Sequence, residues 1–333
     1  MSAIHEPFTA IVVDRPEGKY QAQFRDLTRA DLPDQGDVLV RVRYSSLNYK
    51  DALAVTGKGR IARTFPLVPG IDLAGEVVES VSTDFKPGDA VLVTGCEIGE
   101  VHWGGFSQFA RMRSQWLVPI PQGWDARLAM GVGTAGFTAM LAVMALEHHG
   151  VDKSGEVVVT GAAGGVGSIA LTLLAKAGFQ RILASTGRVE EEPYLKQLGA
   201  TGVIQRAELD QPASPLESQR WAGAVDVVGG QTLSKLISQM RCGGAIAVCG
   251  LAGGADLNTS VYPIILRGVS ILGINSVYIP QSLRLEAWER VARDLSPEMI
   301  ERMMRVEPLS RVPQLSEQVL AGQVRGRVVV DLG

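Results

Sequence analysis

The alternation of apolar and polar residues changes in character about a third of the way along the chain. In the first third, short β-branched and apolar runs are separated by turn signals such as Lys86-Pro87-Gly88-Asp89, a pattern typical of antiparallel strands. The strands predicted there are residues 9–13, 38–44, 73–81 and 90–94. Many short strands with glycine corners indicate a compact β-barrel.

From about residue 125, strand-like and helix-like stretches alternate. A helical pattern over residues 128–147 precedes six candidate strands, namely 157–160, 181–184, 202–204, 224–228, 245–249 and 270–274. Helical patterns fall between or after these strands, at 193–198, 232–240, 281–295, 297–304 and 312–321. This order predicts an α/β fold with a doubly wound, parallel six-stranded sheet.

A last strand-like run, residues 326–331, has no place in this sheet, so we expect it to return to the N-terminal barrel. The sequence therefore predicts a barrel domain over 1–125, a domain with the parallel sheet over 126–268, and a segment 269–333 that supplies the last strand of this sheet and the return.

The first strand of the predicted sheet runs directly into Gly161-Ala162-Ala163-Gly164-Gly165-Val166-Gly167, and an apolar helical pattern follows at once. Glycines in a βα corner allow the backbone to approach phosphates, and the helix N-terminus offers free N–H groups with partial positive charge. The stretch thus predicts a dinucleotide pyrophosphate site.

The end of the next strand indicates which dinucleotide is bound. An NAD site has an acidic residue there to accept hydrogen bonds from the ribose hydroxyls. This chain instead reads Ser185-Thr186-Gly187-Arg188, and the first acid is Glu190. Because a guanidinium group binds phosphate through a planar fork of donors, the segment favours the 2′-phosphate of NADPH. The alternative is a solvated turn in which Arg188 has no ligand.

Composition and charge exclude several other classes of protein. At 333 residues the chain is long for one core, and its net charge of -3 gives no electrostatic reason to bind nucleic acid or an anionic membrane. No apolar run approaches membrane-spanning length, and no signal peptide precedes the first strand. With only three cysteines, the expected compartment is the reducing cytoplasm.

Taken together, these motifs resemble the zinc-free medium-chain dehydrogenase/reductases, in the quinone-oxidoreductase branch. The resemblance extends over essentially the whole chain. Five stretches are similar to the NADPH-dependent acrylyl-CoA reductase group: residues 45–51 (SSLNYKD), 102–106 (HWGGF), 133–139 (GTAGFTA), 249–254 (CGLAGG) and 263–267 (PIILR). The resemblance implies a GroES-like catalytic barrel joined to a Rossmann domain.

The family pattern also implies which residues contact NADPH. The pyrophosphate would lie on Ala163, Gly164, Gly165 and Val166, and the 2′-phosphate on Thr186, Gly187 and Arg188, with Ser185 adjacent and Arg206 within reach. The nicotinamide end would meet Tyr49, Leu251, Ile265 and Ser276, although ordinary packing also explains the apolar members. Thr134 is a further cofactor candidate, or only a helix cap.

Zinc-dependent relatives use a cysteine after the second barrel strand and a Gly-His-Glu segment. This chain has Ser45-Ser46-Leu47-Asn48 and Pro69-Gly70-Ile71-Asp72 at these places. Because neither thiolate nor imidazole is available there, and tetrahedral zinc needs three or four such ligands, we expect no bound metal.

Without a metal to polarise an alcohol, the sequence favours reduction of an activated alkene. Hydride would add to the β-carbon of an enone or enoyl thioester, and hydrogen bonds would stabilise the enolate. The catalytic candidates are Asn48, Tyr49 and Asp51, although Tyr49 also fits an aromatic plug at a barrel rim, and Lys50 and Asp51 could pair with each other.

The resemblance implies a short acyl-CoA substrate, with acrylyl-CoA reduced to propanoyl-CoA. A quinone or enone reductase of the same branch and a non-catalytic NADPH-binding protein remain alternatives. Lys58, Arg60 and Arg63 could receive the phosphates of CoA or form only a solvated basic loop. Residues 270–274 could pair across a two-fold axis, which would make the protein a homodimer.

Overall fold

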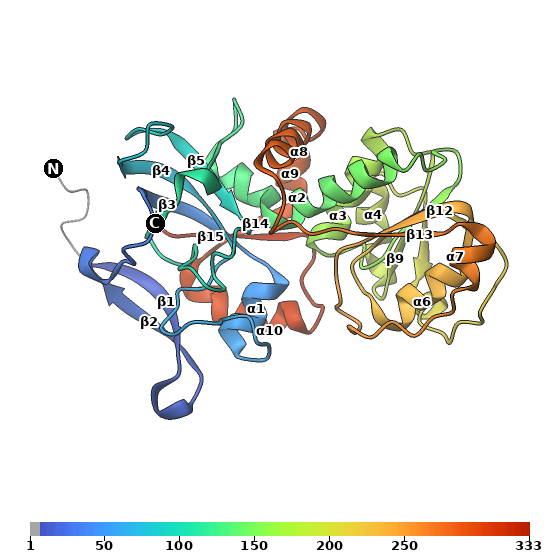
Figure 1. Cartoon of the computed structure of the whole chain (residues 1–333), viewed down its shortest axis with the longest axis horizontal. Helices are drawn as coiled ribbons and strands as arrows, with labels where there is room; N and C mark the ends of the chain where they lie inside the picture. Colours follow the sequence, from blue (N-terminus) through green and yellow to red (C-terminus); the bar gives the residue numbers. More distant parts are fainter. Residues whose placement is uncertain (1–6) are drawn as a thin grey trace. The chain divides into compact units, whose positions relative to one another are not determined.

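The computed structural model describes residues 7–333, which divide into two compact units (Figure 1). The first unit comprises the chain up to residue 134 together with 277–292 and 296–333, and the second comprises 135–276 and 293–295. These limits differ from the predicted domain limits chiefly because residues 126–134 belong to the first unit. The C-terminal segment supplies the last strand of the parallel sheet and then rejoins the first unit at residue 277.

The first unit is built on a seven-stranded sheet in which most neighbouring strands are antiparallel. Its order is β14-β15-β3-β4-β5-β7, and β6 pairs with β3. The bounds are β3 (Val38–Leu47), β4 (Asp72–Ser80), β5 (Ala90–Thr94), β6 (Phe109–Met112), β7 (Val118–Pro119), β14 (Met304–Pro308) and β15 (Arg327–Asp331). The pairing of β15 with β3 confirms the expected return of the C-terminal strand.

A separate antiparallel pair, β1 (Phe8–Asp14) and β2 (Gln21–Leu27), completes the strands of this unit. Alternate residues of the strands face one core, in which Val40, Leu73, Val93 and Val330 are fully buried. The helices of the unit are α1 (Tyr49–Thr56), α8 (Gln281–Asp294), α9 (Pro297–Met303) and α10 (Val312–Leu320).

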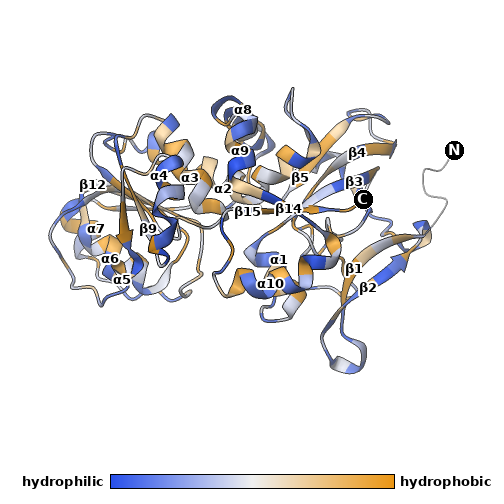
Figure 2. Ribbon diagram, turned by 180° about the vertical axis from the view of Figure 1, so that it is seen from behind, coloured by the Kyte–Doolittle hydropathy of each residue, from blue (hydrophilic) through white to orange (hydrophobic). Residues whose placement is uncertain are grey.

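The second unit is the predicted doubly wound sheet. Six parallel strands have the order β10-β9-β8-β11-β12-β13. Their bounds are β8 (Glu156–Val159), β9 (Arg181–Thr186), β10 (Gly202–Gln205), β11 (Trp221–Asp226), β12 (Met240–Val248) and β13 (Ser270–Gly273). The strands are mostly hydrophobic (Figure 2), as expected for a sheet that is covered on both faces.

Five helices connect these strands: α3 (Gly165–Lys176), α4 (Glu192–Gln197), α5 (Arg206–Leu209), α6 (Gly230–Gln239) and α7 (Tyr262–Arg267). Short 3-10 helices occur at Pro16–Gly18, Arg29–Asp31, Ser114–Trp116, Val189–Glu191 and Leu309–Arg311.

The helix α2 (Ala126–His148) carries the chain from the first unit into the second. Its sequence predicts one continuous helix, but Gly133 has the non-helical values φ 53° and ψ −159°, which interrupt the helix there. By length and composition α2 could cross a membrane, yet 89% of its most apolar window is buried inside the protein.

The sequence pattern missed several helices and strands, namely α1, α5, α7, β2, β6, β7 and β14. These are short or mostly polar: β2, for example, reads Gln-Ala-Gln-Phe-Arg-Asp-Leu and is largely exposed. Such segments have little apolar periodicity, and their structure depends on the strand or helix beside them.

Candidate active site and cofactor site

The glycine-rich corner between β8 and α3 has the geometry of a phosphate cradle. Gly161 has a φ of +56°, and Gly164 caps α3 without any side-chain hydrogen bond to the first turn. A Cβ on Gly167 would overlap the carbonyl oxygen of Gly161, so the corner closes only with glycine at that position. The N-terminal amides of this twelve-residue helix receive no side-chain cap, which suits an anionic group.

The residues predicted to contact the 2′-phosphate lie together at the ends of β9 and β10. Ser185 and Thr186 are the last two residues of β9 and are buried, and the Thr186 hydroxyl accepts a hydrogen bond from the Arg188 amide at 3.0 Å. The Arg188 guanidinium lies 3.7 Å from Glu191. Arg206 begins α5, and its guanidinium carbon would be 3.1 Å from a Cβ on Gly187. The Arg206 guanidinium therefore packs against Gly187, the residue that precedes Arg188 in the chain.

The remaining predicted contacts of the second unit follow its later strands. Leu251 comes after β12 and Ile265 lies on α7, with 57% and 71% of their surfaces exposed. Ser276 follows β13. Ala163 is buried within the glycine corner. The exposed leucine and isoleucine are available for contact with a ligand.

In the first unit, Asn48 and Asp51 begin helix α1. Asn48 is the N-cap, and Asp51, three residues later, accepts hydrogen bonds from the Asn48 backbone amide at 2.9 Å and its side-chain amide at 3.0 Å. The second oxygen of Asp51 accepts from the Ile71 amide at 2.8 Å. Asp51 therefore ties the start of α1 to the segment before β4.

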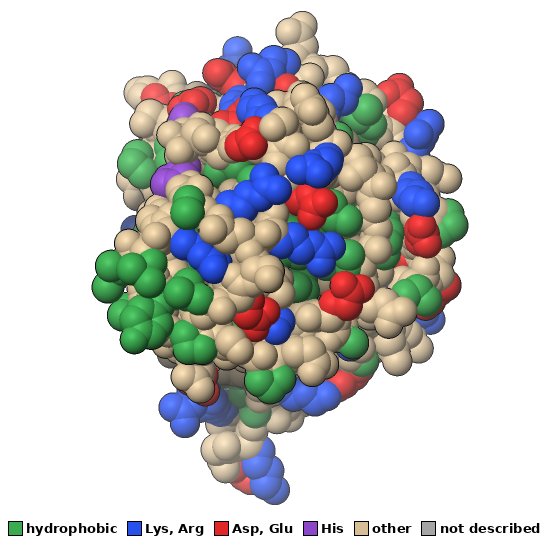
Figure 3. Space-filling model, turned by 90° about the vertical axis from the view of Figure 1, so that its right-hand side faces the viewer, with side chains coloured by type: hydrophobic (Ala, Val, Ile, Leu, Met, Phe, Trp, Pro, Cys, Tyr) green, Lys and Arg blue, Asp and Glu red, His purple; other side chains and the backbone are tan. Residues whose placement is uncertain are grey.

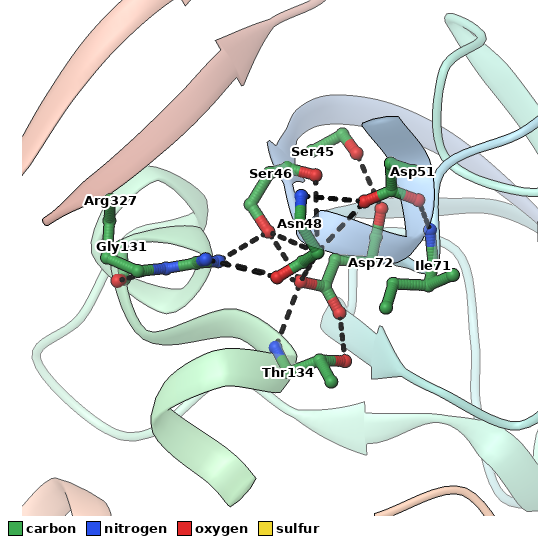
Figure 4. Close-up of polar contacts among 9 residues, drawn as sticks. All are labelled: Ser45, Ser46, Asn48, Asp51, Ile71, Asp72, Gly131, Thr134 and Arg327. Carbon is green, nitrogen blue, oxygen red and sulfur yellow. Dashed lines mark hydrogen bonds and ion pairs between the residues drawn. The ribbon is translucent and has the colours of Figure 1, made fainter. Parts of the chain in front are cut away.

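Asp72 and Arg327 lie beside Asn48 and complete a buried polar network (Figure 4). Asp72 accepts from the side chain of Asn48 at 2.8 Å, from the backbone amide of Thr134 at 2.9 Å, and from the hydroxyls of Ser46 and Thr134. Arg327 donates to the Asn48 side-chain oxygen at 3.0 Å and to the Ser46 hydroxyl at 2.7 Å. Both polar ends of the Asn48 amide are thus used inside the protein.

The kink in α2 belongs to the same network. A Cβ on Gly133 would lie 2.6 Å from both the Arg327 guanidinium and the Asp72 carboxylate. Helix α2 resumes after the kink, and Asp72 receives the backbone amide of Thr134, as an N-cap carboxylate does. Thr134, predicted as either a cofactor contact or a cap, is held by this carboxylate.

Electrostatics in the network are dominated by burial. Burial first, and then the charge of Asp72, raise the pKa of Asp51 to about 7, against the hydrogen bonds from Asn48 and Ile71, which lower it. Burial also lowers the pKa of Arg327, against the attraction of Asp72 and Asp51. The Arg327 and Asp72 side chains approach within 3.7 Å, so one guanidinium group faces two buried carboxyl groups.

Tyr49 differs from its two neighbours in this segment. It is the first residue of α1 after the cap and is 39% exposed. Its hydroxyl makes no hydrogen bond to any residue in 7–333. Tyr49 is therefore positioned by the network through the backbone while its side chain remains available to a ligand.

The possible pairing of Lys50 with Asp51 is wrong. Lys50 instead pairs with Glu100 at 2.6 Å, because the Asp51 carboxylate is buried and accepts hydrogen bonds from backbone amides. Glu100 is also within 3.4 Å of Arg63.

The three basic residues after α1 have different surroundings. Lys58 pairs with Glu317 of α10, and Arg63 lies 3.8 Å from Glu97 in addition to its contact with Glu100. Arg60 is exposed and has no ion pair within the described part of the chain. Arg60 is thus the member of this group with the greatest freedom to meet a phosphate.

Within residues 7–333, no group of three or more His, Cys, Asp or Glu side chains is arranged to hold a metal ion. At the places compared with zinc ligands, Asn48 is hydrogen-bonded into the network and Ile71 contributes its backbone amide to Asp51.

Sequence reasoning missed Asp72 and Arg327 as site residues. Asp72 lies in the segment 69–72, which we compared with zinc-ligand positions, and this place in the sequence could have identified it as a site residue. Arg327 is 279 positions from Asn48, and no local pattern links the two residues.

Comparison with known proteins gives two family matches. Residues 34–122 match the alcohol dehydrogenase GroES-like domain, and residues 165–293 match the family described as zinc-binding dehydrogenase.

Three relatives cover nearly the whole chain. An acrylyl-CoA reductase, AcuI, of Ruegeria pomeroyi is 53% identical over 98% of this chain and 99% of its own. The yhdH oxidoreductase of Salmonella enterica, solved in complex with NADP, has a TM-score of 0.94 at 47% identity and covers 98% of this chain and 100% of that one. YhfP of Bacillus subtilis, described as a putative quinone oxidoreductase and solved with NAD bound, is 43% identical with a TM-score of 0.91 over 98% and 99% of the chains.

These full-length matches agree with the two-unit fold, and the NADP bound in the Salmonella enterica structure agrees with the cofactor expected from the residues after β8 and β9. The chain belongs to the medium-chain dehydrogenase/reductase family, in the group that contains the acrylyl-CoA reductases and their quinone-oxidoreductase-like relatives.

Proposed function

We propose that this protein is an NADPH-dependent oxidoreductase that reduces an activated carbon–carbon double bond, with acrylyl-CoA as substrate and propanoyl-CoA as product. The observation that carries the proposal is the 53% identity to an acrylyl-CoA reductase over 98% of the chain. The glycine corner and the segment after β9 support it independently, since their residue types fit a phosphorylated dinucleotide.

The chain's own residues would hold NADPH through the second unit. Ala163, Gly164, Gly165 and Val166 would present backbone amides to the pyrophosphate at the start of α3. Ser185, Thr186, Gly187, Arg188 and Arg206 would surround the 2′-phosphate. When bound, NADPH supplies the hydride. Leu251, Ile265 and Ser276 would contact the nicotinamide end and exclude water there.

Within the first unit, we assign the ligand contact to Tyr49. Its hydroxyl has no partner in the described part of the chain, whereas both polar ends of the Asn48 amide are taken by Asp51, Asp72 and Arg327. Asn48 and Asp51 would therefore act by fixing the first turn of α1, and Tyr49 would meet the cofactor or the thioester. Thr134 would have the same supporting role through Asp72.

The charged end of the substrate would meet the segment after α1. Arg60 is free of ion pairs within residues 7–333, and Lys58 and Arg63 would exchange their carboxylate partners for the phosphates of CoA. Guanidinium and ammonium groups both bind phosphate through charge-assisted hydrogen bonds.

We propose that the protein is a homodimer through the edge of its parallel sheet. β13 is the last strand of that sheet, and Ile271 on it is 37% exposed. Besides the proposed cofactor contact Ile265, other large apolar side chains on or beside α7 are exposed: Val261, Tyr262, Ile264 and Leu266. Figure 3 shows hydrophobic side chains gathered on one side of the face that it presents. An apolar patch next to an unpaired strand suits association with a second copy.

A reducing cytoplasm is the compartment that we propose. Cys96, Cys242 and Cys249 are all free thiols, as expected where disulfides do not form.

The test is NADPH consumption with acrylyl-CoA, with a simple quinone, and with neither. We expect consumption with acrylyl-CoA and formation of propanoyl-CoA, identified by mass. Consumption with the quinone alone would establish the second candidate, which the similarity to YhfP, described as a putative quinone oxidoreductase, favours. Binding of NADPH without turnover of either substrate would establish a non-catalytic role. Sedimentation of the purified protein tests the dimer.

A further inference from the structure

The carboxyl end of β11 contains a buried carboxylate that the proposed reaction does not use. Asp226 is 0% exposed, and every hydrogen bond it receives comes from a donor at this end of the sheet. One oxygen accepts the Thr160 hydroxyl at 2.6 Å and the Val228 amide at 3.3 Å, and the other accepts the Gly229 amide at 2.8 Å. Because an unpaired carboxylate is costly to bury, these contacts fix the surrounding backbone.

Thr160 links this carboxylate to the glycine corner. It stands between β8 and Gly161, and its amide donates to the Val225 carbonyl at 3.0 Å. Its hydroxyl donates to Asp226 and accepts the Val227 amide at 3.0 Å. A side-chain carbon of Val227 lies 2.5 Å from the place of a Cβ on Gly161. The first glycine of the corner is therefore packed against the turn that Asp226 organises.

On its other side the same turn supports the loop that carries Leu251. Gly229, whose amide Asp226 receives, has a φ of +71°, and a Cβ there would lie 2.6 Å from the Gly254 carbonyl oxygen. The Gly253 amide donates to the Val228 carbonyl at 2.7 Å. The Leu251 loop thus lies directly against the backbone that Asp226 holds.

We infer that Asp226 and Thr160 are positioning residues that hold the glycine corner and the Leu251 loop in one arrangement for the cofactor. The inference rests on the proposed NADPH site, to which neither side chain is assigned as a contact. The corner would hold the pyrophosphate and the loop would face the nicotinamide. Asp226 and Thr160 therefore influence the binding of two groups that NADPH and NADH both contain. Loss of the link should therefore weaken both cofactors by the same factor.

The test replaces the hydroxyl of Thr160 by a methyl group of similar size. We expect Thr160→Val to raise the dissociation constant of NADPH about 5- to 10-fold, measured by fluorescence titration without substrate, since it removes one buried hydrogen bond to a charged group. NADH should weaken by the same factor. Thr160→Ser restores the hydroxyl and should return both constants to within about 2-fold of the wild type.

Two further variants separate positioning from stability. Ser238→Ala removes a buried hydroxyl that donates to the Lys235 carbonyl within α6, away from the sheet end. It should lower the melting temperature and leave cofactor binding unchanged. Asp226→Asn keeps the size of the side chain but turns one acceptor into a donor that faces an amide, so it should raise both dissociation constants. If Thr160→Val shows no cooperative unfolding transition, and is therefore not folded, the Asp226→Asn variant takes its place in the binding test.

The outcomes are distinguishable. If the wild type fails to bind NADPH, the proposed cofactor is wrong and the inference fails with it. If the wild type binds NADPH and the Thr160 and Asp226 variants bind both cofactors as tightly as Ser238→Ala does, the inference alone is overturned.

Discussion

Arg327, at the start of the last strand, donates a hydrogen bond at 3.0 Å to the side-chain oxygen of Asn48, which caps the first helix. The two residues are 279 positions apart. Through this contact the C-terminal return of the chain takes part in holding the segment on which Tyr49 stands.

Removal of the Arg327 guanidinium should be strongly destabilising. Arg327→Ala leaves the buried carboxylate of Asp72 without its cation and Asn48 without its donor, so we expect a loss of about 3 kcal/mol in the free energy of unfolding. Denaturant unfolding measures it. The control is Arg311→Ala, whose weak, half-exposed contact with Glu307 should contribute less than about 0.5 kcal/mol. A loss as small as that of the control would show that the network is not stabilised by Arg327.

The raised pKa of Asp51 predicts how stability depends on pH. Its pKa in the folded protein, about 7, is above the ordinary value of 3.8, so the folded state binds more protons between these values. The stability that Asp51 contributes is therefore fully present below about pH 4 and is lost as the pH rises through 7. We expect the difference in unfolding free energy between the wild type and Asp51→Asn to fall by on the order of 2 kcal/mol from pH 5 to 7.5.

Denaturant titrations at several pH values supply that difference, and Asp51→Asn is itself the control because its side chain does not titrate. If the difference in unfolding free energy between the wild type and Asp51→Asn is constant or increases with pH, the hydrogen bonds from Asn48 and Ile71 outweigh burial in setting the pKa of Asp51.

Arg188 should distinguish the two cofactors. Arg188→Ala removes the guanidinium proposed for the 2′-phosphate, so NADPH binding should weaken by roughly 1.5–3 kcal/mol, the range for a hydrogen bond to a charged group. NADH binding should barely change. The dissociation constants of both cofactors are the measurement, and Arg181→Ala, at the opposite end of β9, is the control. Equal losses for NADPH and NADH would assign Arg188 to the fold instead.

The parallel sheet was the more predictable half of the molecule. Its buried strands are apolar runs, glycine follows β8, β9 and β12 within two residues, and residues 157–167 indicate both the corner and its ligand class within one local stretch. The first unit has weaker signals, because its polar network is assembled from β3, β4, α2 and β15. The sequence singles out Asn48 and Asp51 as candidates, but the contacts made by Asp72 and Arg327 exist only after distant strands pair. The kink at Gly133 is also tertiary, since the network occupies the space that a Cβ would need.

Activity should not depend on zinc. At the positions compared with zinc ligands, the side chain of Asn48 is bonded to Asp51, Asp72 and Arg327, and Ile71 offers no donor atom in its side chain. Elemental analysis of protein purified without added metal should find no stoichiometric zinc, and a strong chelator should leave NADPH turnover intact. Inactivation by chelator that zinc reverses would contradict this interpretation of the site.

The basic segment after α1 should recognise the charged part of the substrate. Arg60 has no ion pair within residues 7–333, and the partner of Lys58 is the exposed carboxylate of Glu317. Neutralising Lys58 and Arg60 together by alanine should raise KM for acrylyl-CoA roughly 5- to 10-fold, about 1–1.4 kcal/mol for exposed charge-assisted contacts, with kcat unchanged. The dependence of KM on salt should become weaker, because fewer phosphate contacts remain to be screened. Turnover of an uncharged enone should not change.

The matched control, Lys19→Ala with Lys86→Ala, removes the same charge from exposed positions elsewhere in the unit and should leave the kinetics of both substrates unaffected. If the Lys58 and Arg60 variant changes acrylyl-CoA and the enone alike, this segment does not bind CoA, and the acyl-CoA assignment rests on the similarity to AcuI alone.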